Sequence, residues 1–204
     1  HFIGGGKSDA YYRMGRIYQE MIPDPDLEMA QAAFNTAIKL DDFDNINEKA
    51  DAHHRLGVIM RGSNVDPKIY VRQFLQAIEL NPKYMSAYSN LGIIYIKNGK
   101  YDEAIEQLKK GIELNPYNYK LHLNLGAAYS YKGKLDDALG EYKIAVKYEP
   151  GQIEVYSVIG NIYIMQKKYS EAVPFFEQAI KLTPDNFIFY FNLEYCYYNM
   201  DGLE

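Results

Sequence analysis

The chain has 204 residues, a formal net charge of −5 and a single cysteine, Cys196. The acidic balance argues against nucleic acid as a partner, because phosphate binding relies on clustered lysine and arginine. One cysteine excludes an internal disulfide, and no apolar run approaches the roughly 20 residues that a transmembrane helix needs. Because residues 1–6 are also too short and too glycine-rich for a secretory signal, we expect a cytoplasmic protein that does not insert directly into a membrane.

The first two units of a repeated pattern are predicted at residues 8–49 and 50–84. Each combines a glycine in its first helix with an aromatic residue and an alanine in its second. The landmarks are Tyr11, Met14, Gly15, Tyr18, Ala30, Phe34 and Ala37, and then Leu56, Gly57, Phe74, Ala77 and Pro82. The first unit carries two extra loops, residues 23–26 between its helices and the acidic connector of residues 41–48 after them.

Three regular units follow at residues 85–118, 119–152 and 153–186, each displaced from the last by the same interval. Their landmarks are Tyr88, Leu91, Gly92, Tyr95, Ala104, Leu108 and Pro116, then His122, Leu125, Gly126, Tyr129, Ala138, Tyr142 and Pro150, then Tyr156, Ile159, Gly160, Tyr163, Ala172, Phe176 and Pro184. A two-helix unit of this length has one apolar face that it cannot bury alone, so neighbouring units must stack. We expect the glycine and alanine positions to let the two helices of a unit approach closely.

Residues 187–204 are predicted to hold only the first helix of a partial sixth unit. This segment is unusually aromatic, whereas the terminal units of stacked repeats normally present a polar outer face. Some of its surface should therefore be adhesive. The candidates for a homo-oligomer interface are Phe187, Phe191, Tyr195 and Tyr198.

The order of landmarks closely resembles the tetratricopeptide repeat, in which an aromatic residue is followed by Leu-Gly, Tyr, Ala, an aromatic residue and Pro. The resemblance implies an all-α fold, a right-handed α-solenoid of five helix pairs plus an additional C-terminal helix. We place no internal domain boundary in it. Residues 1–204 are expected to form one continuous array.

In proteins that this chain resembles, the first helix of each pair lines a concave groove. Carried over by register, the groove residues at the N-terminal end are Tyr12, Arg13, Arg16, His54 and Arg55, and those farther along are Asn90, Ile93, Lys97, Asn124, Tyr131 and Asn161. The arginines would suit an acidic partner segment, because a guanidinium presents a planar fork to carboxylates. The alternative is that they are solvated, or that they pair with acids of the chain such as Asp9, Asp51 and Glu48.

Two asparagines resemble the asparagine ladder with which the repeats of O-linked N-acetylglucosamine transferases bind a peptide backbone. These are Asn90 and Asn124, followed by Asn192 after a break at Val158, and the similarity makes chemical sense because one amide both donates and accepts hydrogen bonds. Asparagine is also a common choice at this place in the repeat. The ladder is therefore one of two interpretations.

No catalytic set, metal site or cofactor motif is recognisable at the spacing that such chemistry needs. His122 replaces an aromatic landmark, so we expect it to pack. The predicted function is a non-enzymatic protein-interaction scaffold that binds a peptide or helix of a partner in the groove. Two alternatives remain open, namely self-assembly through the aromatic C-terminal helix and service as the substrate-recognition arm of a larger enzyme.

Overall fold

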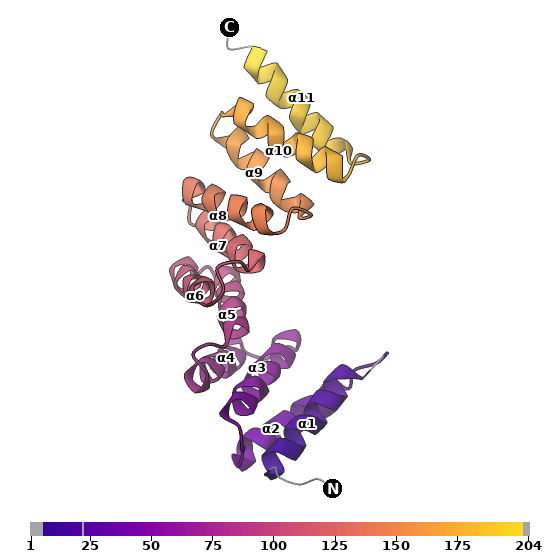
Figure 1. The fold of residues 1–204 in the computed structure, drawn as a ribbon, viewed down its shortest axis with the longest axis vertical. Helices are drawn as coiled ribbons and strands as arrows, with labels where there is room; N and C mark the ends of the chain where they lie inside the picture. The colour runs from indigo at the N-terminus through magenta and orange to yellow at the C-terminus, as the bar shows by residue number, and fades with distance from the viewer. Residues whose placement is uncertain (1–5, 22, 202–204) are drawn as a thin grey trace. The chain divides into compact units, whose positions relative to one another are not determined.

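The computed structural model describes residues 6–21 and 23–201, and all regular secondary structure in this part of the chain is α-helical (Figure 1). Residues 1–5 and 202–204, at the two ends of the predicted array, lie outside the described residues. Eleven helices follow one another within the described part: α1 (Lys7–Glu20), α2 (Leu27–Leu40), α3 (Ile46–Gly62), α4 (Pro67–Leu80), α5 (Met85–Lys97), α6 (Tyr101–Leu114), α7 (Tyr119–Tyr131), α8 (Leu135–Tyr148), α9 (Ile153–Met165), α10 (Tyr169–Leu182) and α11 (Phe187–Asp201).

The chain divides into two compact units, and each is considered by itself. Unit 1 ends at Ile94 and unit 2 begins at Tyr95, so the boundary falls inside α5. Unit 1 holds the pairs α1–α2 and α3–α4, and unit 2 holds the pairs α7–α8 and α9–α10 with α11 packed on α10. The single array over residues 1–204 and its repeat boundaries stay predictions.

The two extra loops of the first repeat differ in outcome. Residues 23–26 are not helical, as predicted, and the carboxylate of Asp26 caps α2 by accepting from the backbone N of Met29 at 2.9 Å. The acidic connector is shorter than predicted, because α3 already begins at Ile46. Asn45 caps that helix through the backbone N of Asn47, and a carboxylate at Glu48 is favourable in the first turn.

The acidic connector also caps the first turn of α1. The carboxylate of Asp42 accepts hydrogen bonds from the backbone N of Lys7 at 3.0 Å and of Ser8 at 2.7 Å. These amides have no partner inside their own helix. The Ser8 hydroxyl donates to the carbonyl of Ala37 at 3.0 Å, which ties the first turn of α1 to the end of α2.

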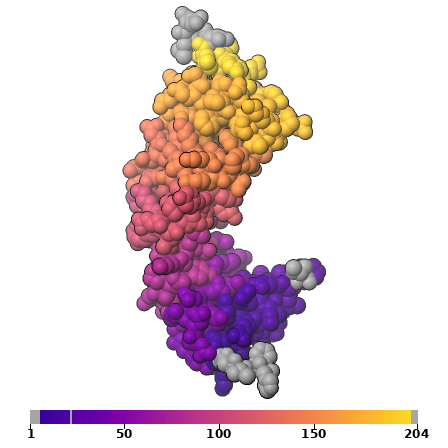
Figure 2. Space-filling model, viewed as in Figure 1, coloured from indigo at the N-terminus to yellow at the C-terminus, as the bar shows by residue number. Residues whose placement is uncertain are grey.

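Close packing inside the helix pairs follows the predicted glycine and aromatic landmarks in both units. A Cβ atom added to Gly15 in unit 1 would lie 2.8 Å from the ring of Phe34, and one added to Gly160 in unit 2 would lie 2.6 Å from the ring of Phe176. Both rings are fully buried. In the space-filling view, the atoms of unit 2 form a continuous surface (Figure 2). The glycine positions therefore let the two helices of a pair approach closely, as predicted.

The repeat period extends to the backbone of the turns in unit 2. Gly99, in the turn between α5 and α6, has a φ of 72°, and Gly133, in the turn between α7 and α8, has a φ of 79°. Lys167, one period after Gly133, takes up the same left-handed conformation with φ of 59° although it is not glycine. The turn geometry is thus imposed by the repeat rather than by the residue, at a steric cost on the order of 1 kcal/mol for the lysine.

Candidate functional site

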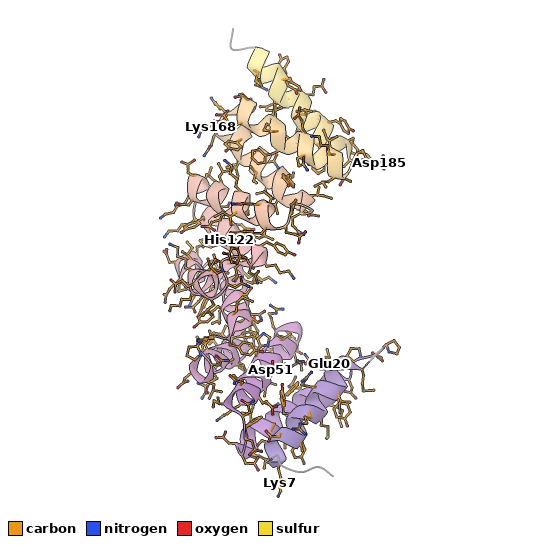
Figure 3. All side chains as sticks on the ribbon, in the orientation of Figure 1. Lys7, Glu20, Asp51, His122, Lys168 and Asp185 are labelled. Atoms are coloured by element: carbon orange, nitrogen blue, oxygen red, sulfur yellow. The ribbon has the colours of Figure 1, made fainter. Side chains whose placement is uncertain are left out.

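Asp51 on α3, which Figure 3 labels, joins two of the predicted groove residues of unit 1, Tyr12 and Arg55. Tyr12 on α1 donates its hydroxyl to Asp51 Oδ2 at 2.7 Å, and Tyr84, just before α5, donates to Oδ1. Arg55 Nε donates to Oδ2 at 2.5 Å. Burial alone would raise the pKa of Asp51, but the hydrogen bonds from Tyr12, Tyr84 and Arg55 outweigh it, and the pKa is lowered.

The two tyrosines act only as donors in this arrangement. Burial, reinforced by the hydrogen bond to Asp51, raises the pKa of Tyr12 to about 12, and the same two causes raise the pKa of Tyr84. Both hydroxyls therefore stay protonated over the physiological range. They hold α1, α3 and the start of α5 to a single half-buried acceptor.

Arg55 is also engaged on its other side. Its Nη1 donates to Gln19 Oε1 at 2.8 Å and to Glu20 Oε1 at 3.2 Å, both near the end of α1. Arg16 shares the Glu20 carboxylate at 3.4 Å. Arg13 is exposed and forms no ion pair with any described residue. Of the three arginines predicted to line the groove, two are thus paired within the chain, and Asp51 is the partner that the alternative interpretation of Arg55 named.

His54 and Asn90 form a second set of contacts that joins the first. Asn90 Nδ2 lies 3.1 Å from His54 Nε2, and His54 Nδ1 lies 3.3 Å from the Tyr84 hydroxyl. These contacts fit a neutral ring that accepts at Nε2 and donates at Nδ1. Burial lowers the pKa of His54 to about 4. The ring also packs on the side chains of Phe74 and Tyr84.

Both atoms of the Asn90 amide are occupied. Its Oδ1 accepts from Arg61 Nη1 at 2.6 Å, and its Nδ2 also donates to the carbonyl of Ser86 at 2.9 Å. An amide with these partners can read a passing peptide only by giving up an existing bond. In unit 1 the structure brings together Tyr12, Arg55, His54 and Asn90, but it does so by joining them to one another.

In unit 2, several side chains at predicted groove positions are exposed or make no hydrogen bond among the described residues. Tyr131, at the end of α7, is 65% exposed, and Met165, one repeat later at the end of α9, is 70% exposed. Asn124 on α7 is half-buried and Asn161 on α9 is exposed, and neither amide has a hydrogen-bond partner among the described residues. Tyr131 stacks in parallel on Tyr101 with ring centroids 5.7 Å apart. This stack holds the ring without covering it.

Two further predicted residues adjoin the boundary between the units. Ile93, the last but one residue of unit 1, is half-buried, and Lys97 at the end of α5 is exposed. Neither makes a polar side-chain contact with the part of the chain that the structure describes.

The C-terminal helix α11 continues the open positions. Phe189 and Cys196 are buried where α11 packs on α10, whereas Phe191 is 66% exposed. By the repeat spacing, Phe191 and Tyr195 stand at the places that Ser157 and Asn161 occupy in the preceding repeat. Tyr195 meets Tyr169 of α10 edge-on, with centroids 6.1 Å apart. These two aromatics therefore belong to the row of groove positions.

One residue of α11 departs from the repeat pattern. Glu194 stands where the preceding repeat has Gly160, whose missing side chain leaves room for the ring of Phe176. A glutamate at this place excludes an aromatic side chain from an equally close second helix. The close glycine-to-ring contact between α9 and α10 therefore has no counterpart at this position of α11.

His122 packs, as predicted. It is buried on α7, with Nδ1 2.7 Å from Glu141 Oε2 and Nε2 2.9 Å from the carbonyl of Pro116. In the preceding repeat, the hydroxyl of Tyr88 makes the same contact with the carbonyl of Pro82 at 3.0 Å. The histidine thus replaces a structural tyrosine.

The described residues contain no group of three or more side chains placed to hold a metal ion. None of the described helices is long and apolar enough to cross a membrane.

Comparison with protein families identifies the repeats. Two models described as tetratricopeptide repeat match residues 86–118 and 108–140, and a model described as TPR repeat matches residues 160–201. The chain is a tetratricopeptide repeat protein, as the landmarks predicted. Such repeats support a role as a protein–protein interaction scaffold. No curated protein sequence matches the chain significantly.

Solved structures confirm the fold. MamA is 23% identical with a TM-score of 0.74, over 86% of this chain and 91% of that one. YrrB, titled a TPR protein with an unusual peptide-binding site, is 22% identical with a TM-score of 0.73, over 90% and 91%. PilF of Pseudomonas aeruginosa is 19% identical with a TM-score of 0.73, over 95% and 86%. The predicted all-α solenoid of tetratricopeptide helix pairs is confirmed.

Proposed function

We propose that this protein is an interaction scaffold that holds an extended segment or a helix of a partner against α7, α9 and α11 of unit 2. A single observation carries the proposal: Tyr131 and Met165, at one predicted groove position of successive repeats, and Phe191, at another predicted groove position on α11, expose 65%, 70% and 66% of their surface. We call these three side chains the apolar row.

The chemistry of the apolar row suits a protein partner. Aromatic residues and methionine are enriched at protein interfaces, where aromatic anchors that fill well-packed pockets contribute much of the binding energy. Methionine adapts its shape to different partners. The free amides of Asn124 and Asn161 offer donors and acceptors for the backbone of an extended segment. The peptide-binding site named for YrrB, a protein of the same fold, supports a peptide as the occupant.

The groove positions of unit 1 contribute less to this proposal. A partner there must displace bonds that Asp51 and Asn90 already make within the chain. Arg13 is the predicted groove arginine without an ion pair among the described residues, so an acidic partner segment is proposed to reach Arg13 rather than Arg55.

The test compares two triple variants of the intact chain in an affinity purification with quantified partner recovery. Tyr131→Ser, Met165→Ser and Phe191→Ser together should lower partner recovery at least about tenfold, because the anchors of an interface carry most of its binding energy. The matched control is Leu114→Ser, Tyr117→Ser and Leu182→Ser, which removes exposed apolar side chains at helix ends and a turn outside the row. Equal recovery with both variants would contradict the proposal.

Self-assembly is the second candidate, because Phe187 and Tyr198 of α11 are each 78% exposed. Sedimentation velocity over a range of concentrations tests it. A chain that associates as wild type and becomes monomeric as Phe187→Asp, Tyr198→Asp supports self-assembly, whereas a wild-type monomer at all concentrations excludes it. The recognition-arm alternative, the absence of catalysis and the cytoplasmic location stay predictions.

A further inference from the structure

A second surface, in unit 1, has a chemistry that the proposed function does not use. A cleft of about 620 Å³ lies between α2, α3 and α4. This volume lies within the range of roughly 300–1,000 Å³ that is usual for ligand sites. The second helices α2 and α4 contribute most of its lining, whereas the groove positions lie on first helices.

The cleft is positively charged in a chain whose net charge is negative. Lys68 and Arg72 lie one helical turn apart on α4, both exposed, and neither has an ionic partner in the described part of the chain. Lys49 also lines the cleft and pairs with Asp41 at 2.5 Å, which neutralises the acid of the lining. Like charges four residues apart repel each other on a helix. A bound anion would relieve that repulsion.

The distribution of arginine points to the same place. All five arginines of the chain fall between Arg13 and Arg72. Arg16, Arg55 and Arg61 are bonded to Glu20, Asp51 and Asn90. Arg13 and Arg72 therefore remain for an external partner, and of these Arg72 is the one that lines a cleft.

The remaining lining is suited to a peptide rather than to a small anion. Leu56 is buried in the floor, and Ile69 is 46% exposed beside it. Asn35 offers an amide that has no partner among the described residues. The same asparagine borders a second depression of about 460 Å³ that runs along α2 to Glu28. Two adjoining depressions form a track longer than a small anion needs.

We propose that this cleft docks a short acidic segment of another protein, with carboxylates against Lys68 and Arg72 and an apolar side chain on Leu56 and Ile69. Arg72 presents two N–H groups to one carboxylate, and Asn35 pairs with a peptide group of the segment. His53, which also lines the cleft, has its pKa lowered by burial, which outweighs the opposing effect of its Nδ1 contact with Gln73 Oε1 at 2.8 Å, so it adds no charge near neutral pH. The cleft and the apolar row lie on different units, so either can fail without the other.

Fluorescence anisotropy with a fluorescein-labelled Leu-Glu-Glu-Leu-Glu-Glu peptide and the intact chain tests this docking site. The acidic peptide should bind saturably, and its affinity should fall with added salt. Leu-Gln-Gln-Leu-Gln-Gln should bind at least about tenfold more weakly. Lys68→Glu with Arg72→Glu should lower the affinity for the acidic peptide by a similar factor. Lys83→Glu is the matched control, an exposed cation of the same unit outside the cleft and outside the predicted groove, and should leave the affinity within about twofold.

Several outcomes would overturn the proposal. These are equal affinity for the two peptides, equal loss with Lys83→Glu, or no saturable binding up to about 1 mM peptide. Free glutarate that competes as tightly as the peptide would make the cleft a small-carboxylate site instead. Circular dichroism of Lys68→Gln with Arg72→Gln, which removes the charges without reversing them, separates lost binding from lost folding.

Discussion

The two units use the same repeat register for different ends. In unit 1 the side chains at groove positions bind one another, through Asp51 and Asn90. In unit 2 the equivalent positions hold exposed apolar side chains and free amides. The comparison teaches that the tetratricopeptide pattern decides which face of a helix a residue occupies, whereas the neighbouring repeats decide whether that residue is available to a partner.

The cause of the difference is visible in the repeat alignment. Asp51 and Arg55 precede the Leu-Gly pair of their repeat by five residues and one residue. At these places unit 2 has Lys120 with Asn124 and then Glu154 with Val158. No carboxylate of unit 2 therefore has a guanidinium four residues later on the same leading helix. Without that pair, a buried network of the kind that Asp51 organises does not form.

The largest expected effect comes from removing the carboxylate that joins unit 1. Asp51→Asn leaves Arg55 without its charge partner and weakens the acceptor for Tyr12 and Tyr84, so we expect a loss of about 3 kcal/mol in the free energy of unfolding. Urea denaturation followed by circular dichroism measures it. In hydrogen exchange, the amides of α3 should lose protection, whereas those of α9 should keep it.

Asp102→Asn in unit 2 is the control for the Asp51 substitution. Asp102 pairs with Lys132, but its side chain is 74% exposed. Exposed pairs contribute little, so the change should stay within about 0.5 kcal/mol. If both substitutions cost the same, the carboxylate of Asp51 does not join unit 1 in the way its geometry indicates.

Acid should weaken unit 1 in a defined pH window. The pKa of His54 is about 4 in the folded chain, below its ordinary value of 6.5, so the unfolded chain binds the extra proton first. Stability is therefore full above pH 6.5 and falls as the pH drops to 4, by up to about 3 kcal/mol from His54. The lowered pKa of His53 acts in the same direction.

Urea unfolding at pH 7.5 and pH 4.5 measures this loss, with His54→Gln as the matched variant. Glutamine keeps hydrogen-bonding groups near Tyr84 and Asn90 but does not titrate. The variant should lose less stability between the two pH values than wild type does. Asp51 does not confuse the result, because its lowered pKa matters only below its ordinary value of 3.8. An unchanged pH dependence would show that His54 is not the titrating group.

The sequence was sufficient for the fold because packing is local to a helix pair. Gly15 with Phe34, and Gly160 with Phe176, follow from spacing alone. The predicted acidic connector is too long at its C-terminal end. Residues 46–48 belong to α3, because Asn45 caps this helix and Glu48 lies in its first turn. Helix ends depend on single capping bonds, which composition does not reveal.

The hydrogen-bond partners of the predicted groove residues could not be predicted from the repeat spacing. Tyr12 meets Asp51 and Arg55 meets Gln19 across 39 and 36 positions of sequence. Such bonds depend on how one helix pair is rotated against the next, and the repeat spacing does not specify that rotation at the level of single atoms. The cleft lies outside the predicted groove for a simpler reason, because Lys68 and Arg72 lie on a second helix, whereas the predicted groove residues lie on first helices.

The smallest expected effect tests whether the two units pack alike inside their helix pairs and differ only at the predicted groove positions. Gly15→Ala and Gly160→Ala should each cost about 2 kcal/mol, because the new methyl group meets the buried rings of Phe34 and Phe176 at 2.8 and 2.6 Å. Gly140→Ala in α8 is the control, since its Cβ would meet nothing within 4 Å. That substitution should stabilise by about 0.5–1 kcal/mol, because alanine is the better helix former. Thermal and urea unfolding of the three variants measure these changes. If Gly15→Ala is tolerated while Gly160→Ala is not, unit 1 is more loosely packed than unit 2, and its polar network rather than its helix packing sets its stability.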